Sequence, residues 1–180
     1  MKEGANILEQ LKVLTAVYDQ GLGCGFLTIE DVIRWCDEVI DVFDNPPYEF
    51  IELSMMSSEK IEDIKHKLLD YYMNVDIDIE FVVNLLLGVI GREFINKHLS
   101  IQESVGFTTK LLIHTGLFSA KGYYDIYRCD DAYDLAVEGI YGGLEDVERD
   151  FTNAISQFEF YYSIFIDLYK SVMTVEWGHK

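Results

Sequence analysis

Few residues of this 180-residue sequence are spaced in a way that would support metal binding. The four histidines, His66, His98, His114 and His179, lie far apart, and none belongs to an H-x₃-H or H-E-x-x-H pair. A di-iron bundle needs Glu-x-x-His motifs on paired helices, whereas the nearest match here, Asp63-x-x-His66, stands alone. Surface or helix-end positions are the simpler interpretation of these histidines. We therefore expect no metal and no cofactor.

Two further chemistries have one candidate each near the N-terminus. The glycine run Gly21-x-Gly23-x-Gly25 follows a predicted helix rather than a strand and lacks the Lys-Ser/Thr of a P-loop, which favours a plain loop. Cys24 lies in this loop and is the candidate for a Cys–His nucleophile, although a small loop residue is the simpler interpretation. Carboxylates are so frequent that no pair of them predicts acid–base catalysis. We expect a protein that is not an enzyme.

Two clusters of acidic residues have the spacing of a helix face. The first consists of Glu30, Asp31, Asp37, Glu38 and Asp41. The second consists of Asp130, Asp131, Asp134 and Glu138, interleaved with Tyr124, Tyr127 and Tyr133. Every amphipathic helix needs a polar face, and this alone could account for the first cluster. Carboxylates mixed with tyrosines also suit the recognition of a Lys/Arg-rich surface, so both clusters are candidate partner-binding sites.

The elements that would position these residues are helices. The clearest spans residues 28–44, where apolar residues recur at i, i+3, i+4 and i+7 opposite the first acidic cluster. Thr28 is its expected N-cap, and Asn45-Pro46-Pro47 ends it. Further helices are expected over residues 5–18, 48–56, 57–72, 78–98, 100–114, 121–139 and 144–172, the last bent near residue 152. Residues 21–26 are expected to form a flexible connection.

The helix over residues 78–98 is apolar nearly all the way round, which predicts that it is buried at the centre of the bundle. Gly88 and Gly91 would let neighbouring backbones approach it closely. Both prolines of the sequence stand at one turn, which favours helices over a strand-rich fold. The sequence thus predicts an all-α protein in which about seven to eight helices form a single compact domain over residues 1–180.

Composition limits the partners that such a domain would bind. The chain carries 32 acidic and 14 basic residues, for a net charge of −18, yet its mean hydropathy is +0.07, so charged and apolar residues must occupy different faces. The electrostatic field of this negative net charge repels nucleic acid and anionic membranes and attracts a basic protein. The apolar run Phe81–Gly91 is too short to span a bilayer, and the N-terminus has no apolar signal core. An odd number of unpaired cysteines indicates a reducing, cytoplasmic compartment.

In charge, size and helicity the chain resembles small, acidic, all-helical bacterial immunity proteins, which neutralise a cognate toxin. Many such toxins are basic nucleases, and the resemblance implies that an acidic helical face occupies the nucleic-acid cleft of such a partner. Our first hypothesis is a non-enzymatic protein that blocks or scaffolds a basic protein partner. The alternative is a ligand-binding protein, sensor or enzyme with an apolar pocket lined by the aromatic C-terminal helix. Homo-oligomerisation through that helix is compatible with either.

Overall fold

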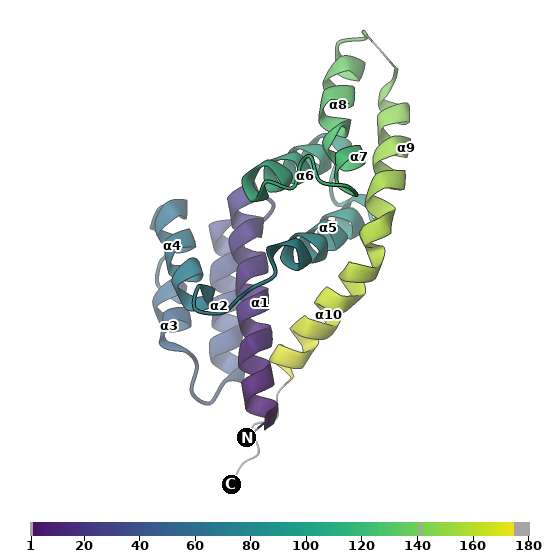
Figure 1. The fold of residues 1–180 in the computed structure, drawn as a ribbon. Helices are drawn as coiled ribbons and strands as arrows, with labels where there is room; N and C mark the ends of the chain where they lie inside the picture. Colours follow the sequence, from purple (N-terminus) through teal and green to yellow (C-terminus); the bar gives the residue numbers. More distant parts are fainter. Residues whose placement is uncertain (1, 141, 175–180) are drawn as a thin grey trace. The chain divides into compact units, whose positions relative to one another are not determined.

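The computed structural model describes residues 2–140 and 142–174, and its regular structure there is entirely helical (Figure 1). The helices are α1 (Lys2–Cys24), α2 (Ile29–Val42), α3 (Tyr48–Ser54), α4 (Ile61–Tyr72), α5 (Ile79–Ile95), α6 (Ile101–Thr115), α7 (Tyr124–Tyr127), α8 (Cys129–Val137), α9 (Leu144–Ile155) and α10 (Glu159–Met173). A 3₁₀ turn, η1 (Ser156–Phe158), stands between α9 and α10. Within the described ranges, eight helices have nine or more residues, which confirms the predicted all-α class and helix number.

The helices are distributed over two compact units. Unit 1 consists of residues Met1–Asp78 and Ile166–Lys180, and unit 2 of residues Ile79–Phe165. Helix α10 contributes residues to both units. The first acidic cluster, on α2, therefore belongs to unit 1, and the second, on α7 and α8, belongs to unit 2. The expectation of one domain over residues 1–180 stays a prediction.

Unit 1 is built around Trp35, which lies fully buried on α2. Its ring stacks on Tyr18 with centroids 3.9 Å apart and meets Phe50 edge-on at 5.2 Å. The predicted start of α2 is confirmed by a capping box, in which Asp31 N donates to Thr28 Oγ1 (3.2 Å) and Thr28 N donates to Asp31 Oδ2 (3.0 Å). Trp35 is fully buried, whereas Ile33 is only partly buried, so the core-facing side of α2 includes Trp35.

The glycine run was expected to be a flexible loop, and this prediction is wrong. Helix α1 continues through Cys24, and the chain turns only at Gly25, whose φ is +82°. Leu27 then folds back, with its N–H donating to the carbonyl of Gly21 at 3.0 Å. A Cβ at Gly21 would lie 2.7 Å from Leu27 Cδ1, so the glycine provides close packing rather than flexibility.

Helix α5 is the buried helix of unit 2, as predicted, and it packs against α6, α9 and η1. Most of its residues from Val82 to Gly91 are buried. Gly88 permits a close backbone approach, because a Cβ there would lie 2.6 Å from Tyr162 N and 2.8 Å from Phe158 O. The expected role of this glycine is therefore confirmed.

The single helix expected over residues 121–139 is interrupted. Gly122 has a φ of +100°, so the helix cannot begin at Lys121. Tyr123 is buried, and its hydroxyl donates to Asn84 Oδ1 on α5 at 2.7 Å, which fixes the point at which α7 begins. Helix α8 follows after Arg128. In Figure 1, α8 and α9 lie side by side and antiparallel.

Two other expected boundaries differ from the structure. The C-terminal helix changes at η1 rather than near residue 152. Helix α4 begins at Ile61 instead of residue 57, and its buried face comprises Ile64, Leu68, Tyr71 and Tyr72. Among the residues that the structure describes, no helix is long and apolar enough to cross a membrane.

Candidate protein-binding surface

A high concentration of negative charge lies on α7, α8 and the first part of α9. Residues 124–150, here called the acidic hairpin, carry nine acidic residues and two arginines. Both arginines pair with carboxylates on their own helical turn. Arg128 lies 3.9 Å from Asp125, and Arg149 lies 2.8 Å from Asp146 and 3.6 Å from Asp150.

The remaining acidic residues of the hairpin have no ion-pair partner within the described ranges. They are Asp130, Asp131, Asp134, Glu138, Glu145 and Glu148. Partial burial, together with the negative charges of Asp134 and Asp131, raises the pKa of Asp130. The hairpin therefore holds uncompensated negative charge that a cationic partner would stabilise.

Apolar side chains are exposed among these carboxylates. Four aliphatic residues near the connection between α8 and α9 are 37–65% exposed, namely Leu135, Val137, Ile140 and Leu144. Tyr124 is 59% exposed, while the ring of Tyr127 packs against Phe118 with centroids 5.5 Å apart. The tyrosines belong to the predicted site, but the aliphatic residues do not. The sequence did not predict that these aliphatic residues are exposed, because exposure depends on how the helices pack.

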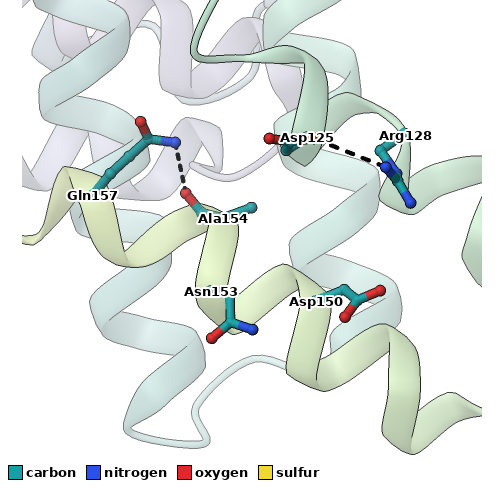
Figure 2. A pocket seen from close by; sticks show the side chains of 6 residues that line it. All are labelled: Asp125, Arg128, Asp150, Asn153, Ala154 and Gln157. Carbon is teal, nitrogen blue, oxygen red and sulfur yellow. Dashed lines mark hydrogen bonds and ion pairs between the residues drawn. The ribbon is translucent and has the colours of Figure 1, made fainter.

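A polar groove lies between α7 and α9. Its volume is about 490 Å³, and Figure 2 shows its lining by Asp125, Arg128, Asp150, Asn153, Ala154 and Gln157. Gln157 Nε2 donates to the carbonyls of Ala154 (2.9 Å) and Gly122 (3.1 Å), which joins η1 to the segment before α7. Within the lining, Asp125 and Arg128 form an ion pair at 3.9 Å.

A second groove, the α6–α8 groove, has a volume of about 320 Å³. It is lined by Gln102, Glu103, Val105, Gly106, Phe107 and Lys110 of α6 and by Asp130, Tyr133 and Asp134 of α8. Two carboxylates of the second acidic cluster, Asp130 and Asp134, and one of its tyrosines, Tyr133, therefore line a concave surface, which the sequence did not predict. The α6 side was missed because nothing in the sequence shows that α6 and α8 are neighbours.

The first acidic cluster, on α2, is partly used inside the protein. Although partial burial acts in the opposite direction, hydrogen bonds from Thr28 and the Arg34 charge lower the pKa of Asp31. Glu38 accepts a hydrogen bond from the hydroxyl of Tyr169. Glu30, Asp37 and Asp41 are exposed. Two of the five carboxylates of this cluster thus have structural roles, which makes it the weaker candidate.

The candidate nucleophile Cys24 is buried, and so are the other two cysteines. Cys24 belongs to the last turn of α1, is 1% exposed and donates its thiol to the carbonyl of Gly21 at 3.4 Å, so its expected loop position is wrong. Cys36 and Cys129 are also buried, and burial raises the pKa of Cys36 to about 12 and that of Cys129 to about 11. No described cysteine is in a disulfide.

The histidines lie at the surface within the described ranges, and His179 lies outside them. His66 is 3.8 Å from Asp70, and His98 is 2.8 Å from Glu93. Among the described residues, no group of three or more His, Cys, Asp or Glu side chains is arranged to hold a metal ion.

Comparison of the chain with protein-family models, curated proteins and solved structures gave no match. The function must therefore be argued from the geometry and charge of the surface itself. The resemblance to immunity proteins stays a prediction.

Proposed function

We propose that this chain is a non-enzymatic protein that binds a basic protein partner through its acidic hairpin. Its biological role would be that of a cytoplasmic immunity-type inhibitor of a nuclease-like toxin. The observation that carries the proposal is the set of unpaired carboxylates on α8 and α9, which stand beside exposed aliphatic and tyrosine side chains.

This combination is what a protein interface requires. Exposed aliphatic and aromatic groups contribute free energy when a partner removes them from water. Carboxylates around them favour a partner with lysines and arginines, accelerate the encounter and disfavour acidic competitors. The mutual repulsion among Asp130, Asp131 and Asp134 would be relieved in the complex, so binding gains from charges that weaken the free protein.

A nuclease is a fitting target because its cleft must attract phosphates with basic side chains. A row of carboxylates on a helical hairpin presents negative charge at the surface of a narrow rod, and such a rod could enter the cleft and exclude nucleic acid. The alternative of an apolar ligand pocket stays a prediction. The two grooves described above are lined mainly by polar and charged side chains, so they do not add support to it.

The test compares two variants whose net charge changes equally. In the hairpin variant, Asp131, Glu138 and Glu145 are replaced by lysine; in the α2 variant, Glu30, Asp37 and Asp41 are replaced by lysine. All six side chains are exposed. Tagged wild-type protein and both variants are used to capture partners from the native host, and retained proteins are identified by mass. The purified partner is then assayed for nuclease activity with and without the wild-type chain.

We expect the wild type and the α2 variant to retain one basic protein in stoichiometric amount and the hairpin variant to lose it. The association rate should fall as salt rises, because charges more than about 10 Å apart are screened at 0.1 M ionic strength. Equal retention by the hairpin variant, or the absence of any basic protein, would overturn the proposal. A partner whose nuclease activity is unaffected would remove the inhibitor role and leave only binding.

A further inference from the structure

The α6–α8 groove has a shape that accepts a side chain. Its volume of about 320 Å³ is near the lower end of the roughly 300–1,000 Å³ of small-ligand sites. Gly106 lies in its wall, and a Cβ at this position would meet nothing within 4 Å. Because Gly106 is in the interior of α6, where alanine would be more stable, the missing side chain widens the groove without improving the packing.

The unpaired carboxylates of the groove favour a cationic ligand. Asp130 and Asp134 lie one turn apart on α8, and neither has an ion-pair partner in the described residues. On the α6 side, Glu103 is already engaged in the capping box of α6, where it accepts hydrogen bonds from Ser100 N (2.8 Å) and Ser100 Oγ (2.7 Å). Lys110 is exposed and lies beyond ion-pair distance of both aspartates.

Two aromatic residues in the lining favour arginine over lysine as the cation. Phe107 and Tyr133 line the groove together with the two aspartates. The planar guanidinium of arginine stacks on aromatic rings and binds carboxylates through two parallel hydrogen bonds, whereas the lysine ammonium is a strongly hydrated point charge. We propose that the α6–α8 groove receives an arginine side chain of the basic partner, with its guanidinium at Asp130 and Asp134. This inference rests on the proposed function and adds the chemistry by which the partner is recognised.

The test uses a defined probe, an alanine-based helical peptide with several arginines, and a matched peptide in which neutral citrulline replaces each arginine. Both are titrated into the ¹⁵N-labelled protein, and the amide signals of residues 105–110 and 129–134 are followed. We expect saturable shifts of these signals with the arginine peptide and none with the citrulline peptide. A lysine peptide should bind more weakly than the arginine peptide.

Two variants test the groove itself. Gly106→Leu fills it without changing the net charge, and Asp130→Asn with Asp134→Asn removes its negative charge. Each should weaken binding of the arginine peptide by about tenfold, which corresponds to about 1.4 kcal/mol. Gly106→Ala controls for the helix, and Asp131→Asn with Glu138→Gln removes equal charge outside the lining. Gly106→Ala should change the affinity by less than about threefold, and the Asp131→Asn, Glu138→Gln variant should lose less affinity than the Asp130→Asn, Asp134→Asn variant.

Three outcomes would overturn the inference: no binding of the arginine peptide, equal binding of the citrulline peptide, or equal losses in the groove and control variants. The last would indicate attraction by the acidic hairpin as a whole. Failure here is distinguishable from failure of the proposed function. If the groove variants still capture the basic host protein and the lysine-substituted hairpin variant does not, the groove assignment is wrong and the proposed function stands.

Discussion

Asp130 and Asp134 lie one helical turn apart on α8, and both line the α6–α8 groove without an ion-pair partner in the described residues. Carboxylates at this spacing repel each other by roughly 0.2–0.5 kcal/mol on a helix surface. Partial burial and the charges of Asp134 and Asp131 raise the pKa of Asp130 above its usual 3.8. The native protein thus holds an unfavourable arrangement of charges, which a bound cation would stabilise.

Replacing Asp134 with asparagine should lower the pKa of Asp130 toward its ordinary value. Because a raised carboxyl pKa gives stability that is lost as pH rises through the folded-state pKa, the variant should be more stable than the wild type above that pKa, by roughly 0.2–0.5 kcal/mol. Below pH 3.8 the difference should vanish. NMR titration of the Asp130 carboxyl carbon, with urea unfolding at neutral and acidic pH, measures both effects. An unchanged Asp130 pKa in the variant would contradict this account.

Two glycines in the middle of helices should respond to alanine in opposite ways. Gly106→Ala places a methyl group in open space and reduces the entropy of the unfolded chain, so it should stabilise the protein by about 0.4–1 kcal/mol. Gly88→Ala places the methyl group 2.6 Å from Tyr162 N, where backbone cannot move aside, and should destabilise by about 1–3 kcal/mol or more. Denaturant unfolding measures both. Equal responses would mean that α5 is not packed closely at Gly88.

Much of the fold follows from local signals in the sequence. Helix α6 begins at a capping box formed by Ser100 and Glu103, and α5 begins within one residue of its predicted start, although it ends at Ile95 rather than at residue 98. The failures arise where tertiary contacts decide. Helix α7 begins only after Tyr123, which is held by Asn84, a residue 39 positions earlier in the chain.

The candidate site shows the same division. The acidic residues of α8 can be found from spacing alone, because helix periodicity places Asp130, Asp131 and Asp134 within one arc. Gly106 and Phe107 cannot, since only the packing of α6 beside α8 brings them to Asp130. The structural role of Glu38 in the α2 cluster could not be predicted either, because its hydrogen bond from Tyr169 joins residues 131 positions apart.

In unit 1, the hydroxyl of Tyr72 donates to Oδ2 of the buried Asp19 at 2.6 Å. Burial and this hydrogen bond raise the pKa of Tyr72, so the phenol stays a donor throughout the physiological range. Tyr72→Phe should therefore cost about 1.5–3 kcal/mol, as for other hydrogen bonds to charged groups. Tyr71 is the matched control, because its ring packs on Phe50 and its Tyr71→Phe variant should change stability by less than about 0.5 kcal/mol. Equal losses in thermal unfolding would show that the Tyr72 hydroxyl is not what stabilises this site.

The three cysteines should be unreactive in the native protein. Cys24, Cys36 and Cys129 are each at most 2% exposed, and burial raises the pKa of Cys36 to about 12 and that of Cys129 to about 11, so little thiolate exists at pH 8. A thiol reagent such as Ellman's should label the native chain only as fast as it opens, and label all three thiols at once in denaturant. Rapid labelling of one thiol in the native state, assigned with Cys24→Ala, would reveal an accessible nucleophile. That result would support the Cys–His alternative, whereas uniform protection would give this alternative no support.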